Sequence, residues 1–121
     1  MSKLVLVAED DNDILSLVLA VLEDVGFKVT SATGPETIAK VKGRRPDVIL
    51  LDYQMPGMDG VTVAQMLHRD PETASIPIVA MTAAGRAAFV CREMDAQGCL
   101  GKPFDIDSLV NTVERLAHTT H

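Results

Sequence analysis

Aromatic side chains are scarce in this sequence of 121 residues, which has no Trp, one Tyr and three Phe. Aliphatic side chains must therefore fill the core, and a hydrophobic content of 47% supplies enough of them for an ordinary globular protein. The length is typical of one domain. We therefore expect residues 1–121 to form a single domain.

Long hydrophobic segments are also absent. The longest apolar run, residues 14–22, is interrupted by Ser16 and is much shorter than the roughly 20 residues that a membrane helix needs. The first strand-like segment begins almost at Met1, which leaves no space for a signal peptide. We expect a cytoplasmic protein that does not insert into membranes.

Cysteine is rare as well. Cys91 and Cys99 do not have the short spacing of zinc or redox motifs, and two cysteines are too few for a disulfide scaffold. The sequence therefore predicts two free, buried thiols.

Basic residues are outnumbered, with 11 Lys and Arg against 17 Asp and Glu, giving a net charge of −6. A surface of this sign repels phosphate. We therefore expect no direct binding to nucleic acid.

Strand-like and helix-like segments alternate along the chain. Short apolar runs predict strands, and apolar residues at helical spacing between capping residues predict helices. The predicted strands are residues 3–8, 27–31, 47–51, 76–81 and 98–101, and the predicted helices are 12–25, 35–42, 61–69, 86–94 and 105–117. This α/β alternation is typical of a parallel sheet with helices on both faces, whose ligands bind at the carboxyl ends of the strands.

Three carboxylates are placed at that edge, because Glu9 and Asp10 follow the first strand and Asp52 follows the third. A single acidic residue at a strand end is usually a solvated turn former. Three that converge would repel one another unless a hard cation lay between them, and oxygen ligands suit Mg²⁺. The pattern therefore predicts a magnesium site.

A hydroxyl and an ammonium group are expected at the same edge, from Thr82 after the fourth strand and Lys102 after the fifth. Phosphoryl transfer needs a positioned nucleophile and positive charge around the phosphoryl oxygens. Asp52 can attack phosphorus to give an aspartyl phosphate, while Lys102 pairs with a phosphoryl oxygen and Thr82 donates its hydroxyl. The combination predicts a phosphoacceptor site.

Four segments carry a family resemblance: VAEDD (7–11), LLDYQMPGMDG (50–60), AMTA (80–83) and KPF (102–104). In this order they resemble the motifs of receiver domains of two-component response regulators of the chemotaxis-regulator type. The resemblance extends over essentially the whole chain. It implies a flavodoxin-like, doubly wound (βα)₅ fold with the strand order 2-1-3-4-5.

The resemblance also implies site residues and partners. Glu9, Asp10 and Asp52, with the backbone carbonyl of Gln54, would bind Mg²⁺. The phosphoryl donor would be a phosphohistidine on a sensor histidine kinase or phosphotransfer protein, and the domain would dephosphorylate itself slowly. The signal would pass to a downstream protein, and the domain would be a monomer or a weak phosphorylation-dependent dimer.

The switch residues depart from the family pattern at one position. By resemblance, Thr82 moves toward the phosphoryl group and a Tyr or Phe ring fills the vacated space, but this chain has Cys99 at the ring position. A small thiol fills little volume. We expect the response to lie in residues 55–59 and 83–86 rather than in residues 99–110.

An apolar stripe in the first predicted helix has two interpretations. Leu15, Leu19 and Leu22 lie beside the apolar positions expected to face the core, 14, 17, 18, 21 and 25. The stripe either packs under the last helix or forms a docking surface for a phosphotransfer domain.

Three alternative functions differ from a working receiver. A flavin mononucleotide site needs a phosphate-binding loop after the first strand, where this chain has three acidic residues. A haloacid-dehalogenase-type phosphatase usually has an acidic residue where this chain has Gln54. A degenerate receiver that binds partners without phosphorylation stays open, because Cys99 replaces the usual ring.

Overall fold

Buried aliphatic runs form the sheet of this computed structural model, which describes residues 3–118. The strands are β1 (Leu4–Ala8), β2 (Lys28–Ala32), β3 (Val48–Asp52), β4 (Ile78–Ala83) and β5 (Gly98–Lys102). The helices are α1 (Asn12–Asp24), α2 (Thr37–Gly43), α3 (Gly60–Arg69), α4 (Ala87–Met94) and α5 (Ile106–Ala117), and a short 3₁₀ turn, η1 (Ala84–Arg86), precedes α4.

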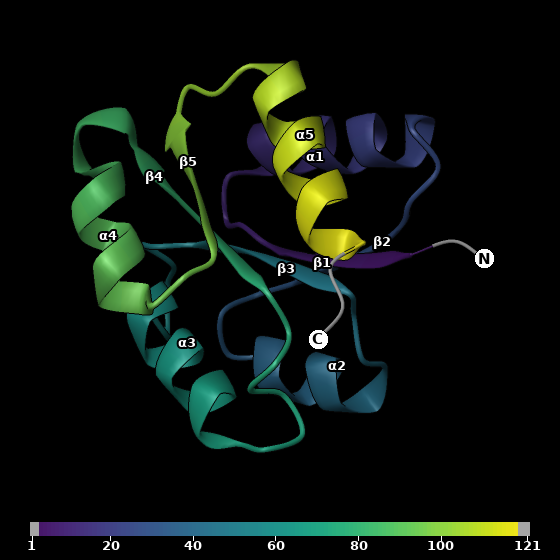
Figure 1. Ribbon diagram of the computed structural model, residues 1–121. Coiled ribbons are helices and arrows are strands. Elements are labelled where there is room, and N and C mark those ends of the chain that lie inside the picture. The colour runs from purple at the N-terminus through teal and green to yellow at the C-terminus, as the bar shows by residue number, and fades with distance from the viewer. Residues whose placement is uncertain (1–2, 119–121) are drawn as a thin grey trace.

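The strands pair in parallel in the order β2-β1-β3-β4-β5. Helices α1 and α5 cover one face of the sheet, and α2, α3 and α4 cover the other (Figure 1). Each face has its own aliphatic core, with Val18 and Val113 in one and Leu67 and Val90 in the other. The predicted doubly wound, flavodoxin-like fold is confirmed. Within residues 3–118, no helix is long and apolar enough to cross a membrane.

Aspartates begin three of the helices. Asp11 accepts hydrogen bonds from the backbone N–H groups of Asp13 and Ile14 at the start of α1. Asp59 and Asp105 cap α3 and α5 in the same way. A side-chain oxygen at this position satisfies backbone donors that the helix leaves unpaired. The Asp11 side chain therefore has a structural role beside the acidic cluster.

The predicted core face of α1 is correct only in part: Val18 is buried and Ile14 and Val21 pack against the core, but the other two of the five positions are exposed. Val18 and Leu22 are fully buried and Leu15 and Leu19 are half-buried against the core, whereas Leu17 is 50% exposed. Val25, also expected in the core, is 43% exposed. Leu15, Leu19 and Leu22 therefore share the buried side of α1 with Val18, and this side packs against the sheet and α5.

The prediction of free cysteines is also wrong, because Cys91 of α4 and Cys99 of β5 form a disulfide. Both residues are half-buried rather than buried. Asp95 ends α4 in the left-handed conformation (φ 49°), and the chain then turns back along the helix as β5. This reversal brings residues eight positions apart within a Cα–Cα distance of 5.9 Å.

Candidate functional site

The carboxyl ends of β1 and β3 bring three acidic residues together. Glu9 follows β1 directly, and Asp52 is the last residue of β3. One carboxylate oxygen from each of Glu9, Asp10 and Asp52 lies within 4.8 Å of the others. The Glu9 and Asp52 side chains are buried and Asp10 is exposed, so the cluster opens to solvent on one side.

Lys102, at the end of β5, supplies the positive charge of the cluster. Its Nζ forms an ion pair with Glu9 and donates a hydrogen bond of 3.2 Å to Asp52 Oδ1. The peptide bond between Lys102 and Pro103 is cis. One ammonium group thus links carboxylates from two different strand ends.

The electrostatics of the cluster favour a protonated acid when no cation is bound. Burial, followed by the nearby Glu9 carboxylate, raises the pKa of Asp52 to about 8, and the Lys102 ammonium offsets only part of this increase. Burial acts to lower the pKa of the Lys102 ammonium, but its contacts with Glu9 and Asp52 outweigh burial and raise it. The one Lys102 ammonium therefore does not neutralise the three acidic groups of the cluster.

A cavity of about 380 Å³ joins the acidic cluster to the other predicted site residues. Its walls include Thr82, which is buried at the end of β4, and the exposed Gln54, which follows β3 by two positions. This cavity is therefore lined by Gln54 and by all five side chains proposed for phosphoryl transfer and metal binding, which are Glu9, Asp10, Asp52, Thr82 and Lys102. Cys99 does not line this cavity.

Gly60 fixes the chain beyond Asp52. It begins α3 and donates a backbone hydrogen bond of 2.9 Å to the carbonyl of Tyr53. A Cβ atom at this position would overlap the carbonyl oxygen of Asp52. The glycine thus allows α3 to start directly against the end of β3, and it holds the loop that borders the cavity.

Arg86 also lines the cavity, although it was not among the predicted site residues. Its guanidinium lies 5.5 Å from the ring centroids of both Tyr53 and Phe89. The available signal was weak: Arg86 follows Thr82 by four positions, and a 3₁₀ turn rather than the predicted helix start places it at the rim.

The cluster fits a magnesium ion. Among the described residues, Glu9 Oε1 is the one buried side-chain oxygen or nitrogen atom without a hydrogen bond, and its contact with Lys102 is an ion pair only. A hard cation prefers carboxylate oxygens and retains water on its open side, and exposed Asp10 leaves such an opening. The donor set and its excess negative charge both suit Mg²⁺.

Comparisons with known proteins all indicate the same family. The model of the response regulator receiver domain matches residues 5–114. The "DNA-binding dual master transcriptional regulator RpaA" of Synechocystis sp. is 37% identical over 96% of this chain and 49% of its own length. The chain thus spans about half of that relative, and it spans a quarter of the response regulator PleD of Caulobacter vibrioides, 24% of its length.

Solved structures agree with this assignment. A putative response regulator from Chloroflexus aurantiacus has a TM-score of 0.93 at 28% identity, covering 98% of this chain and 100% of its own. The receiver domain of the sensor histidine kinase PA1611 from Pseudomonas aeruginosa has the same fold, with a TM-score of 0.89 at 24% identity and coverage of 98% and 100%. Its structure is described with a magnesium ion coordinated in the active site cleft. With the family model matched over most of its length, this chain belongs to the receiver domain family of response regulators.

Proposed function

We propose that Asp52 is the phosphoacceptor of this receiver domain, within a single domain of residues 1–121. The observation that carries the proposal is the burial of the Asp52 carboxylate beside Glu9 and under the Lys102 ammonium. Receiver domains accept phosphoryl groups from histidine kinases in phosphorylation-based signalling. Among the acidic residues of the cluster, Asp52 is the one that both ends a central strand and accepts a hydrogen bond from Lys102.

The chain's own groups can carry the transfer. A carboxylate oxygen of Asp52 attacks phosphorus, a new P–O bond forms, and the P–N bond to the donor histidine breaks. Lys102 then pairs with a phosphoryl oxygen, and the Thr82 hydroxyl donates a hydrogen bond to another. Slow hydrolysis at the same site returns the Asp52 carboxylate.

Magnesium is the proposed cofactor, held by Glu9, Asp10 and Asp52 with the backbone carbonyl of Gln54. Receiver domains bind Mg²⁺ in an acidic site, and the oxygen cluster of this chain supports that assignment. When bound, the ion neutralises negative charge on the carboxylates and on the phosphoryl group.

Treatment with acetyl phosphate and Mg²⁺ should add one phosphoryl group to the protein, as measured by intact mass. The addition should be lost with a chelator, because the three acidic side chains then repel the incoming phosphate. Unchanged mass in the folded protein at saturating Mg²⁺ would contradict the proposal. It would favour the alternative of a degenerate receiver that binds partners without phosphorylation.

The proposed donor is a phosphohistidine on a sensor histidine kinase or phosphotransfer protein, and α1 carries the surface that fits it. An apolar hollow of about 290 Å³ is lined by Ile14, Leu17, Lys102, Pro103 and Phe104. Because Lys102 lines both this hollow and the acidic cavity, a donor seated there would reach Asp52. Docking is thus assigned to exposed Leu17 instead of the stripe of Leu15, Leu19 and Leu22, which packs against the core.

Leu17→Asp should reduce phosphotransfer from a phosphohistidine donor, identified by screening purified histidine kinases, by about tenfold. Phosphorylation by acetyl phosphate should be unchanged, since this small donor needs no docking surface. Val25→Asp is the matched control, because Val25, directly after α1, is similarly exposed but does not line the hollow. An equal loss with both donors would show that Leu17 acts through the fold and would remove the docking assignment.

The response to phosphorylation is proposed to pass from Thr82 into residues 55–59 and 83–86, with Cys99 providing no ring to rotate. The target is proposed to be a protein, and the domain a cytoplasmic monomer or weak phosphorylation-dependent dimer. The cytoplasm is the compartment in which kinases make phosphohistidine from ATP. A net charge of −6 supports a protein target over nucleic acid.

A further inference from the structure

The disulfide between Cys91 and Cys99 joins two elements that both lead to the phosphoacceptor cavity. Cys99 lies on β5 three residues before Lys102, and it is paired in register with Ala80 of β4, two residues before Thr82. Cys91 lies in the C-terminal half of α4, which follows Thr82 through η1. The bridge therefore ties a helix that leaves the cavity to a strand that returns to it.

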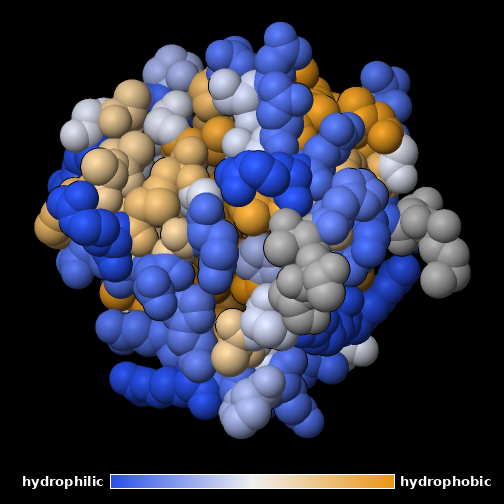
Figure 2. All heavy atoms as spheres, viewed as in Figure 1, coloured by the Kyte–Doolittle hydropathy of each residue, from blue (hydrophilic) through white to orange (hydrophobic). Residues whose placement is uncertain are grey.

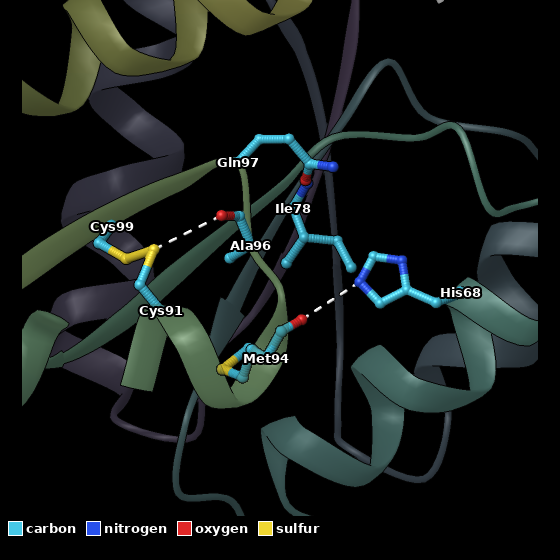
Figure 3. The surroundings of a disulfide bond; sticks show 7 residues. All are labelled: His68, Ile78, Cys91, Met94, Ala96, Gln97 and Cys99. Atoms are coloured by element: carbon cyan, nitrogen blue, oxygen red, sulfur yellow. Dashed lines mark hydrogen bonds between the residues drawn. A yellow bond between two sulfur atoms is a disulfide. The ribbon is translucent and has the colours of Figure 1, made fainter. Parts of the chain in front are cut away.

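The turn between the two cysteines is held in place by contacts that do not involve the bridge (Figure 3). Gln97 makes two hydrogen bonds with Ile78, one through its N–H at 3.0 Å and one through its side-chain oxygen at 2.8 Å. Nε2 of His68 lies 3.2 Å from the carbonyl oxygen of Met94, to which it donates when protonated. The N–H of Ala96 donates to the carbonyl of Cys91 at 3.0 Å.

These contacts have a consequence for the reduced protein. They hold the turn without the bridge, so we expect the two cysteines to stay near their Cα–Cα distance of 5.9 Å, which suits a disulfide, when the bridge is reduced. Cys91 Sγ also lies 3.5 Å from the carbonyl oxygen of Ala96, a ready acceptor for a thiol proton. Both cysteines are half-buried, which leaves a path for a small oxidant. The site therefore accommodates both the disulfide and the two free thiols.

The bridge changes how α4 is attached to the sheet. At its start, α4 is fixed because the preceding η1 packs closely against β5. The contact is so close that a Cβ atom added to Gly101 of β5 would lie 2.6 Å from Ala84 Cα. At its end, the bridge adds a covalent attachment to the same strand. The outer face of α4 carries exposed Phe89, and pale orange atoms of moderately hydrophobic residues gather over this part of the molecule (Figure 2). The bridge fixes the helix that carries this exposed face to β5.

We propose that Cys91 and Cys99 form a reversible thiol–disulfide site that fixes α4 on β5 and limits the response of α4 to phosphorylation. The proposed oxidant is a peroxide. With hydrogen peroxide, one thiol gives up its proton and attacks an oxygen atom; the O–O bond breaks, and the departing hydroxide takes that proton and leaves as water, so that a sulfenic acid remains. The second thiol then attacks the sulfenic sulfur, forms the S–S bond and releases another water. Two thiols thus lose two electrons and two protons, and a dithiol reductant returns them by exchange. The effect on α4 rests on the proposed function, whereas the redox chemistry does not.

The redox half is tested by counting alkylated cysteines in the intact native protein. After treatment with dithiothreitol two alkyl groups should be added, and after hydrogen peroxide none, with full return to two on renewed reduction. Cys91→Ser and Cys99→Ser should each take up one group after reduction. A bridge that native-state dithiothreitol does not open, or two thiols that peroxide joins between molecules, would overturn the proposal.

The regulatory half is tested by hydrogen exchange with and without beryllofluoride, a mimic of the phosphoryl group. In the reduced protein, beryllofluoride should change exchange in residues 87–94, and this change should be lost in the oxidised protein. Cys91→Ser, and Cys99→Ser as a second variant, should keep the change under both conditions. Equal changes in both redox states of the unsubstituted protein would overturn the regulatory half while leaving the proposed function intact. No change anywhere, residues 55–59 included, would instead remove both the phosphoryl response and the regulatory half, with the alkylation result unaffected.

Discussion

Lys102→Ala should slow phosphorylation of Asp52 by acetyl phosphate about 100-fold at saturating Mg²⁺. The Lys102 ammonium contacts both Glu9 and Asp52, and it is the lysine that lines the cavity among the described residues. Its loss removes the ammonium group that contacts Asp52 from the place where phosphoryl oxygens develop charge. The rate is measured by intact mass at successive times.

Two controls separate charge at the site from general effects. Lys40→Ala removes a lysine with an exposed ion pair to Glu36 and should leave the rate unchanged. Lys102→Arg keeps the charge and should recover part of the rate. Because removal of Lys102 leaves buried Glu9 without its ion pair, circular dichroism must show a folded protein. A folded Lys102→Ala variant with the original rate would contradict the proposed role of Lys102.

Asp52→Asn should stabilise the protein in the absence of Mg²⁺, raising the free energy of unfolding at pH 7 by about 1–3 kcal/mol. The pKa of Asp52 is raised in the folded protein to about 8, mainly by burial and by Glu9. Folding at pH 7 must therefore protonate Asp52 or confine its charge beside Glu9. The amide of asparagine carries no charge and avoids this cost.

The pH dependence has a definite sign. When the pKa of an acid is higher in the folded state, protonation of that acid stabilises the folded state. This contribution is fully present below the pKa of the unfolded state, near 4, and is lost as pH rises toward about 8. The advantage of Asp52→Asn should thus be small at pH 4 and grow up to pH 8 in urea unfolding. The exposed Asp24→Asn should change stability by no more than about 0.5 kcal/mol. A variant less stable than the original protein at pH 8 would show that Asp52 is not under repulsion.

The sheet and its carboxyl edge could be predicted from sequence because each strand is a short aliphatic run with an abrupt polar end. The segment before Asp52, for example, is buried at every position. In a parallel sheet such ends meet on one side, so the order of residues alone placed Glu9, Asp52 and Lys102 near one another. The structure brings these three side chains into contact.

Other features depend on packing that local patterns do not encode. The edge of the α1 core face was misassigned at Leu17, because Leu17 and Leu22 are equally apolar and the position of α5 decides which is buried. On α5, Ile106 is 52% exposed although it lies at helical spacing from Leu109, Val113 and Leu116, which are buried. The disulfide was missed because eight-residue spacing pairs cysteines only if a helix ends and a strand returns beside it.

The most direct test of the central claim is to locate the phosphoryl group. Protein treated with acetyl phosphate and Mg²⁺ is reduced with sodium borohydride, which converts an aspartyl phosphate to homoserine, and is then digested and sequenced by mass spectrometry. Homoserine should appear at position 52 and should be absent from the sample with chelator and from Asp52→Asn. Homoserine at Asp10 or Asp11, or undiminished labelling of Asp52→Asn, would contradict the assignment of Asp52 as the phosphoacceptor.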